Sequence, residues 1–400
     1  MSGVTTDPRL VRKAPRRPLR ISWSDERFRN IVYQVLVVGA VAALIFWLWS
    51  NTSYNLAVRR IATGWGFLWR EAGLPIGEHL IPYDPSDTYF RALLVGVLNT
   101  LKVAIIGIVL STLLGTLLGI ARLSRNWMLA KFAGTYVEVV RDLPLLLQLL
   151  FWYSLLQGLP GPRQALHPMD GVFLSNRGLK LPFVEWNVAY GWALLAFALG
   201  MIGTWLYRRA ARERQMQDGQ PRAVWPTGLA LMVGLPLAVW AAFGAPFTPD
   251  VPELRGFNFR GGLDVSPEFF ALLLGLTLYT AGFIAEIVRA GILAVSQGQW
   301  EAAEALGLSR RRVMSLVVLP QALRVIIPPM TSQFLNITKN SSLAVAIGYQ
   351  DIVSIANTTL NQTGQAIEGI AIIMLVYLTI SLSISLFMNW YNKRIALVER

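Results

Sequence analysis

Long apolar runs constrain this chain more than any other feature, because a run of about 20 apolar residues is long enough to cross a bilayer as a helix. Of the 400 residues, 54% are hydrophobic and 15% are charged. This composition excludes a soluble domain built around one buried core. We predict an all-α integral membrane protein with about eight spans. The predicted spans cover residues 31–50, 91–121, 133–156, 188–207, 227–245, 268–292, 313–334 and 368–390.

Basic residues fall in short clusters beside these apolar runs. The formal net charge is +13, a value that in a soluble protein would suggest nucleic-acid binding. Here four arginines lie within the stretch 208–214 between two spans, and Lys393 and Arg394 follow the last span. Basic residues flank spans on the cytoplasmic side. We therefore predict that both termini are cytoplasmic, that membrane lipid surrounds the chain and that it binds no nucleic acid.

The chain lacks the residue sets that enzymatic sites require. Cysteine is absent, which excludes disulfides and zinc–thiolate sites. The two histidines, His79 and His167, lie in predicted external loops and are expected to be solvated. No GxxxxGK[ST] phosphate-binding loop occurs. We predict no catalytic residue, no metal site and no bound cofactor, so the energy for any transport must come from a partner or from an ion gradient.

The N-terminal part divides into three segments. Residues 1–30 are basic and proline-bearing, which is typical of a cytoplasmic tail. Residues 31–50 form an additional first span, and residues 51–89 are predicted to be an external loop with an amphipathic piece on the surface. In the next span, glycines at positions 107, 115 and 119 predict close packing against another helix.

A polar segment, residues 290–320, separates two apolar spans and is expected to be a folded cytoplasmic loop. Its residues 299–306 are good helix formers, and Gly307 can adopt the left-handed conformation that ends a helix. Ser309 can cap a second short helix that carries three arginines. The pattern predicts two short helices that meet at a corner.

The first of these helices has the surface chemistry of a docking site. Small side chains at Ala302 and Ala303 would let a partner approach the backbone closely, and two acids, Glu301 and Glu304, lie beside them. The alternative is a charged loop without a partner.

These residues also resemble a known family. The sequence Glu301-Ala302-Ala303, followed by Gly307 and by Leu319-Pro320, resembles the EAA loop of permease subunits of bacterial ABC importers. The flanking text is similar to the polar amino acid permease branch of that family. The matching stretches are residues 283–292, 298–299, 319–322 and 339–343.

The resemblance implies a type I ABC importer transmembrane domain over residues 90–395, with residues 290–320 as the cytoplasmic coupling loop that docks on an ATPase subunit. Compared with a minimal member, residues 157–267 would be an insertion with two extra spans and outward-facing loops. The chain would be a non-enzymatic permease subunit in the bacterial cytoplasmic (inner) membrane.

By the same resemblance, this subunit translocates amino acids together with a second permease subunit, a copy or a paralogue. The partner ATPase uses ATP and Mg, and a periplasmic or extracellular amino-acid-binding protein delivers the substrate. The alternative is an ion-gradient-driven secondary amino acid transporter, which would predict internal repeats and several buried acids along the spans. The sequence leaves open which amino acids are moved and what the insertion does.

Candidate substrate-pathway residues lie in two of the spans or just after them. Lys339 follows a predicted helix break at Pro328-Pro329, where its ammonium could meet a substrate carboxylate. Asn340 stands where the family often has aspartate, which weakens any strict preference for basic amino acids. Thr280 is the third candidate. The alternative is that Lys339 pairs with Glu286 or extends outward to the interface.

Glu138 and Arg141 are three residues apart and can pair on one helix face. Their positions resemble the start of the second core helix of the family. A structural ion pair is favoured over direct substrate contact.

Overall fold

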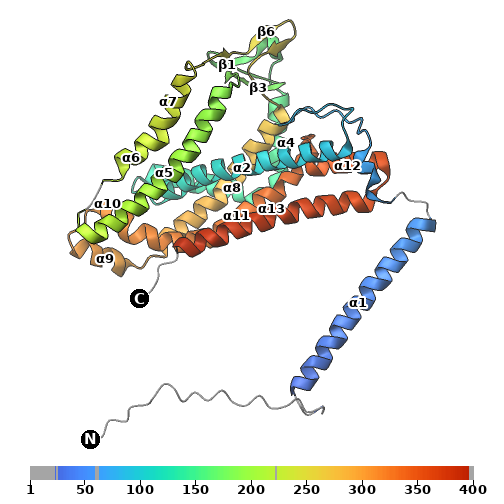
Figure 1. The fold of residues 1–400 in the computed structure, drawn as a ribbon, viewed down its shortest axis with the longest axis horizontal. Helices are drawn as coiled ribbons and strands as arrows, with labels where there is room; N and C mark the ends of the chain where they lie inside the picture. The colour runs from blue at the N-terminus through green and yellow to red at the C-terminus, as the bar shows by residue number, and fades with distance from the viewer. Residues whose placement is uncertain (1–22, 24–25, 59–62, 221–222, 396–400) are drawn as a thin grey trace.

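The computed structural model describes residues 23, 26–58, 63–220 and 223–395, and these residues form a helical bundle with a small β region at one end (Figure 1). In chain order the long helices are α1 (Glu26–Val58), α2 (Tyr89–Arg122), α3 (Trp127–Asp142), α4 (Leu145–Gln157), α5 (Val188–Asp218), α8 (Pro267–Leu293), α11 (Leu319–Asn340), α12 (Ile352–Thr363) and α13 (Ala366–Ile395). Shorter helices and turns are η2 (Trp65–Trp69), η3 (Pro162–Gln164), α6 (Trp225–Leu229), η4 (Ala230–Gly234), α7 (Leu235–Ala242), α9 (Gln297–Ala305), α10 (Arg310–Val313), η5 (Met314–Val318) and η6 (Ser341–Ile347).

The number of spans agrees with the prediction once one bent pair is counted as a single span. Within the described residues, seven helical segments are long and apolar enough to cross a membrane, and α3 with α4 makes an eighth although the two helices meet at 104°. The predicted span over 133–156 is therefore present as two helices with a bend between them. Pro144 stands at the cap of α4 with extended backbone, and a proline has no N–H to continue the preceding helix.

The packing of α2 against α8 organises the core. A Cβ atom on Gly115 would lie 2.6 Å from Cβ of Ile284, and one on Gly119 would lie 2.7 Å from the carbonyl oxygen of Ala285. No side chain fits at either position, so the two backbones approach closely. This confirms the close packing predicted from the glycines. Of all the spans, α8 is the most deeply buried.

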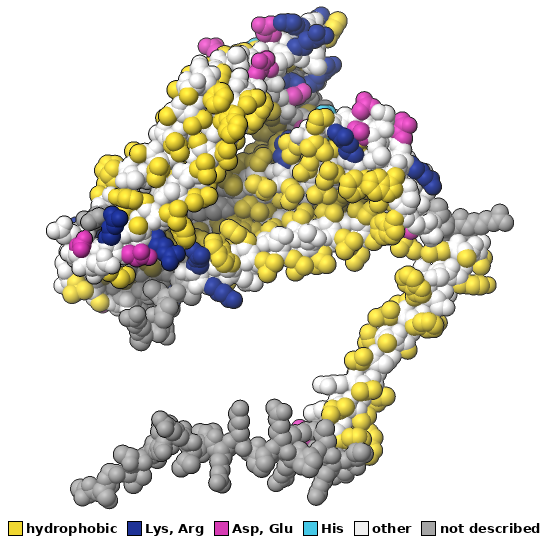
Figure 2. Space-filling view, viewed as in Figure 1, with side chains coloured by type: hydrophobic (Ala, Val, Ile, Leu, Met, Phe, Trp, Pro, Cys, Tyr) yellow, Lys and Arg dark blue, Asp and Glu magenta, His cyan; other side chains and the backbone are white. Residues whose placement is uncertain are grey.

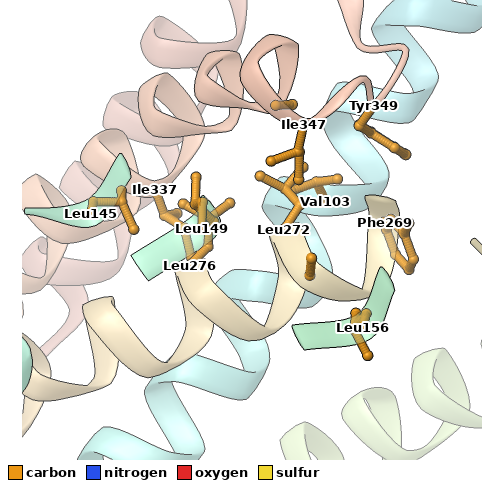
Figure 3. Close-up of a cluster of buried hydrophobic side chains, with 12 residues drawn as sticks. Val103, Leu145, Leu149, Leu156, Phe269, Leu272, Leu276, Ile337, Ile347 and Tyr349 are labelled. Atoms are coloured by element: carbon orange, nitrogen blue, oxygen red, sulfur yellow. The ribbon is translucent and has the colours of Figure 1, made fainter. Parts of the chain in front are cut away.

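A central apolar cluster joins α2, α4, α8, α11 and η6 (Figure 3). Leu272 and Leu276 of α8 are fully buried against Leu149 of α4 and Ile337 of α11. Burying a leucine or isoleucine side chain stabilises the fold by about 2 kcal/mol relative to leaving it exposed to water. The cluster therefore fixes α4, α8 and α11 at the level where α11 ends.

The segment before α2 differs from its prediction as a loop with a surface-lying piece. The first helix α1 continues to Val58, stands away from the other helices and buries none of its apolar window (Figure 1). After it, η2 places Phe67 at 0% exposure in a second core cluster. The side chain of Asn99 holds the rest of the segment by donating to the carbonyl oxygen of Glu78 at 2.9 Å.

The insertion contains two helical arms and a β region. Helix α5 packs against η4 and α7, and Gly200 of α5 has no room for a Cβ beside the backbone of Leu231. The two predicted extra spans are both present. Helix α5 continues to Asp218, eleven residues beyond the predicted end at residue 207, since the basic stretch stays helical.

The outward loops of the insertion were predicted as loops, but they contain strands. We call residues 158–187 and 246–266 the β-cap. Its strands are β1 (Leu166–Met169), β2 (Val172–Ser175), β3 (Gly178–Leu181), β4 (Phe183–Val184), β5 (Pro249–Asp250), β6 (Glu253–Arg255), β7 (Asn258–Arg260) and β8 (Leu263–Val265). One antiparallel sheet has the order β1-β2-β3-β8, while β4-β5 and β6-β7 are separate pairs. The strand β8 leads directly into α8, so the β-cap lies at the end of α8 opposite α9 (Figure 1).

Candidate functional site

The polar segment after α8 forms the predicted corner of two short helices. Helix α9 ends at Ala305, and Gly307 has φ of 73°, the left-handed conformation. Its N–H donates to the carbonyl oxygen of Glu304 at 2.9 Å. Ser309 occupies the cap position of α10, yet its side chain makes no cap hydrogen bond. The corner is confirmed, and the capping role of the Ser309 hydroxyl is wrong.

Helix α9 has one buried face and one free face. Ala303 is 4% exposed and packs with Val295, Val313 and Val318 in the cluster under the corner. Glu301 and Ala302 are exposed. Leu306, which the sequence reasoning did not single out, is 81% exposed. An apolar residue directly before the glycine that ends an amphipathic helix was the available signal.

The corner is fastened to the helix that follows it. The side-chain amide of Gln321 donates to the side-chain oxygen of Gln299 at 3.2 Å. Between α10 and α11 the chain makes a π-helical turn, η5, and Pro320, which cannot donate a backbone hydrogen bond, follows it. The side-chain hydrogen bond between Gln321 and Gln299 therefore joins α9 to α11.

An ion-pair cluster lies on the coupling-loop side of α2 and α8. The carboxylate of Glu286 pairs with the guanidinium of Arg122 at the end of α2, and it also accepts from Nη1 of Arg289 at 3.0 Å. The side chains of Arg122 and Glu286 are 15% and 31% exposed. This overturns the alternative in which Glu286 pairs with Lys339, because two arginines already satisfy the carboxylate.

The pathway candidates lie near the end of α11 and in the middle of α8. Helix α11 runs through Pro328 and Pro329 without a break, so the break predicted there was wrong. The chain instead changes to the 3₁₀ segment η6 immediately after Asn340. Lys339 is exposed and Thr280 is 3% exposed. Among the described residues, no hydrogen bond or ion pair joins Lys339, Asn340 and Thr280.

Helix α11 continues through its two prolines while it is packed against neighbouring helices. Each proline lacks the N–H that would bond to the carbonyl four residues earlier. The apolar face of α11 is buried against α8 and α13. Such packing allows a membrane helix to keep internal prolines.

Glu138 and Arg141 do not form an ion pair in the described structure. Glu138 is exposed, and the guanidinium of Arg141 lies over the ring of Phe283 with 5.1 Å to the centroid. The side chain of Arg141 also packs beside Gly282 of α8. Arg141 therefore joins α3 to α8 through a cation–π contact, where the sequence had suggested a pair within one helix.

A buried acid beyond η6 was missed by the sequence reasoning. Asp351 is 0% exposed and caps α12, since Oδ1 accepts from the backbone N–H of Ser354 at 2.9 Å. Burial raises the pKa of the Asp351 carboxyl to about 7. The signal was its place three residues after the left-handed Gly348 and directly before a helix. It ties the segment after Lys339 to the core.

The described residues contain no group of three or more histidine, aspartate and glutamate side chains placed to hold a metal ion. The polar groups of the corner between α9 and α10 are two exposed carboxylates and a run of arginines. These groups can bind a protein surface or lipid headgroups, and they can position a partner.

The apolar helices that are long enough to cross a membrane define the class of this protein as a multi-pass membrane protein. Residues 227–397 match the family model described as "Binding-protein-dependent transport system inner membrane component". The chain is 51% identical over 382 residues to the putative amino-acid ABC transporter permease protein YhdX of Escherichia coli (strain K12), covering 95% of this chain and 97% of that protein.

A second relative agrees. The general L-amino acid transport system permease protein AapQ of Rhizobium johnstonii is 50% identical over 386 residues, covering 95% of this chain and 96% of that protein. The chain belongs to the amino-acid ABC transporter permease family. It is a multi-pass inner-membrane subunit of an ATP-driven importer. It is the permease component, and a separate subunit hydrolyses ATP.

The similarity of this chain to solved structures is weaker than its similarity to these sequence relatives. The structure described as an amino acid ABC transporter with histidines has a TM-score of 0.45 and 21% sequence identity, covering 76% of this chain and 95% of that chain. The family assignment rests on the sequence relatives.

Proposed function

We propose that the α9 corner docks on the ATPase subunit and transmits its movement to the transport pathway. The observation that carries this proposal is the two-faced character of α9. Ala303 is held in the core while Glu301, Ala302 and the 81% exposed Leu306 face away from it. An exposed leucine beside small and acidic residues is suited to a partner's cleft, because apolar anchors carry most of the energy of an interface.

The movement has a direct route into the membrane. Closing of the ATPases on ATP and Mg would displace Glu301 to Gly307. Helix α8 would carry this displacement, because the backbone of α2 packs directly against it at Gly115 and Gly119. Close-packed helices move as rigid pieces. The pathway then alternates between inward-open and outward-open states, and this chain makes and breaks no covalent bond.

The substrate class that we propose is the L-amino acid zwitterion. Lys339 supplies an exposed ammonium at the end of α11 for the substrate carboxylate, and Thr280 and Asn340 supply uncharged polar groups in α8 and beside η6. The printed name of AapQ, a general L-amino acid transport permease, supports a broad preference. Because residue 340 is asparagine and not an acid, this position supplies no carboxylate that would select amino acids with basic side chains.

Three further partners complete the proposed assembly. A second permease subunit, a copy or a paralogue, lines the pathway together with this chain. A periplasmic or extracellular binding protein delivers the amino acid, in keeping with the description of the matched family. Membrane lipid surrounds the exposed apolar faces of the spans.

The docking proposal is tested by co-purification. The double variant Glu301→Arg/Gly307→Glu and the single variant Leu306→Glu are expressed with the ATPase, reconstituted in nanodiscs and compared for ATPase recovery and amino-acid-stimulated ATP hydrolysis. We expect at least about a tenfold loss of ATPase recovery for each. Glu213→Arg is the matched control, since Glu213 is an exposed acid elsewhere on the chain, 3.3 Å from Arg209.

Two outcomes contradict the docking proposal. ATPase recovery that is equal for wild type, the α9 variants and the control would place the docking surface elsewhere. Transport that follows an imposed ion gradient with no ATPase bound would favour a secondary transporter.

The pathway proposal is tested by the uptake of labelled amino acids. Lys339→Gln removes the ammonium and is expected to raise KM about tenfold with little change in ATPase recovery, while Lys339→Arg keeps the charge and retains most of the affinity. Equal KM values for Lys339→Gln and wild type would show that Lys339 only extends toward solvent.

A further inference from the structure

We infer that the β6–β7 hairpin of the β-cap is the docking point for the soluble substrate-binding protein. This inference rests on the proposed function, because it takes the α9 corner as cytoplasmic and the opposite end of α8 as external. The argument uses the position of the hairpin, its exposed side chains and its mechanical connection to α8.

The hairpin lies at the outermost tip of the molecule. Figure 1 places β6 beyond β1 and β3 and beyond the ends of α5 and α7, which are the membrane-spanning arms of the insertion. Aromatic residues near a bilayer surface normally serve as interfacial anchors. That reading suits the exposed Trp186, which directly precedes α5. It does not suit the hairpin, because the whole β-cap separates the tip from the spans.

The tip exposes an aromatic ring among arginines. Phe257, in the turn between β6 and β7, is 72% exposed, while Phe259 two residues later is 6% exposed and packs on Phe173 with centroids 4.5 Å apart. The guanidinium of Arg163 lies 4.1 Å from the centroid of the Phe257 ring. An exposed phenylalanine beside arginines has the composition of an interface anchor.

The charge around this ring is positive. Arg163, Arg255 and Arg260 are exposed, and the nearest acid of the hairpin is Glu253, 3.2 Å from Arg255. Figure 2 shows Lys and Arg side chains, in dark blue, gathered at this end of the molecule. Charge complementarity therefore calls for a partner with an acidic surface that also offers an apolar pocket for Phe257.

A partner on the hairpin would act on α8 directly. Strand β3 pairs with β8 in the register Lys180↔Asp264, and Lys180, 5% exposed, is paired with that aspartate. Gly178 of β3 leaves no room for a Cβ beside the backbone at Val265. Ser266, the residue between β8 and α8, caps α8 and donates its N–H to Glu78 at 3.1 Å. The β-cap is thus joined to the first turn of α8, and the other end of α8 leads into α9.

The partner that fits this placement is the binding protein on which the matched family of transport systems depends. It would meet Phe257 in the β-cap at one end of α8, while the ATPase would meet Leu306 at the other end. Because α8 connects the two surfaces, docking outside and ATP hydrolysis inside would be coupled through one helix.

The test uses the complete importer in nanodiscs with its purified binding protein, loaded with an equimolar mixture of L-amino acids. Two variants, Phe257→Asp and Phe257→Ala/Arg255→Glu, are compared with Phe247→Ala, an aromatic residue of the β-cap that is 66% exposed near the end of α7. We expect the binding-protein concentration for half-maximal ATPase stimulation to rise about tenfold or more for both tip variants. Basal ATPase activity, ATPase recovery and Tm should match wild type, and Phe247→Ala should behave as wild type.

A photo-crosslinker at position 257 identifies the occupant without relying on the ATPase. A crosslink to the binding protein supports the inference. A crosslink to lipid in nanodiscs that contain phosphatidylglycerol, or to a second copy of this chain, overturns it, as does an unchanged half-maximal concentration in both tip variants. Loss of ATPase recovery in the α9 variants speaks only to the proposed function, so the two failures are distinguishable.

Discussion

The α2–α8 core and the α5–α7 arms of the insertion are both apolar helical pairs, but they are packed very differently. Helix α8 is buried along most of its apolar window and contacts α2, α3, α4 and α11, whereas α5 and α7 pack mainly against one another. Figure 2 shows the hollow with apolar walls between the arms and the core. Hydropathy alone does not distinguish the two pairs, because the helices of both are apolar enough to lie in a lipid bilayer. The difference suggests that the core is rigid and that the arms are an attachment.

The largest expected effect comes from overpacking the core. Gly119→Leu would place side-chain atoms against the carbonyl oxygen of Ala285, 2.7 Å from the Cβ position, and should destabilise the fold by about 3 kcal/mol or more. Most of the protein should be lost from the monodisperse peak in detergent chromatography. Gly39→Leu in α1, where nothing lies within 4 Å, is the control and should leave the peak unchanged. A normal peak for Gly119→Leu would show that the core is no more rigid than the arms.

The same substitution in the arms should have a local effect. Gly200→Leu has no space beside the backbone of Leu231, so α5 should separate from η4 while α2, α8 and α11 keep their contacts. Limited trypsin digestion at Arg208 to Arg214 should become about fivefold faster or more, because cleavage follows the population of the open form. ATPase recovery should stay within twofold of wild type. Loss of ATPase recovery would mean that the arms support the coupling corner.

Ion pairs offer a finer comparison of the two regions. In the core, Glu286→Gln leaves Arg122, whose side chain is 15% exposed, without its carboxylate, at a cost of about 2 kcal/mol. In the arms, Glu213→Gln removes a pair whose side chains are 69% and 66% exposed, which should change stability by under about 0.5 kcal/mol. Thermal unfolding followed by tryptophan fluorescence gives both values. Equal shifts would contradict the assignment of the core pair as structural.

The smallest effect concerns pH. Asp351 titrates with a pKa of about 7 in the folded protein and near 3.9 when unfolded, so the folded state holds the proton more tightly. Its contribution is fully present at low pH and is lost as the pH rises through about 7. Between pH 5.5 and pH 8.5 the wild type should lose roughly 5 °C of Tm relative to Asp351→Asn, whose amide oxygen can still cap Ser354. Parallel Tm profiles would show that Asp351 does not titrate in this range.

Residue patterns predicted local features well where a local cause sets them. The corner at Gly307 was predictable because only a glycine readily takes the positive φ that ends α9. Close packing of α2 was predicted from the glycines at 107, 115 and 119. The structure places Gly115 and Gly119 against α8, and Gly107 mainly against Ile337 of α11. The exposed face of α9 includes Glu301 and Ala302, which the sequence reasoning named, and Leu306, which it did not name. Its exposure depends on which side of α9 the neighbouring helices bury.

Predictions that depended on a partner elsewhere in the chain were less successful. Glu286 could pair with any nearby cation, and the fold brings Arg122 from a helix more than 160 residues earlier. Arg141 meets the ring of Phe283 on another helix in the same way. Pro328 and Pro329 were expected to break α11, but burial against α8 and α13 keeps the helix intact. Each choice is made by contacts that have no signature within a short stretch of sequence.

By itself the sequence determined the membrane class, the positions of the spans, the close packing of α2 at its glycines and the corner that follows α8. These features depend on the length of apolar runs, on the size of one side chain and on one permitted backbone angle, all of which are properties of neighbouring residues. Only the tertiary structure decided the 104° bend between α3 and α4, the burial of Phe67, the partners of Glu286 and the β-cap on α8. These features depend on which distant surfaces meet, since burial and pairing energies belong to contacts between elements.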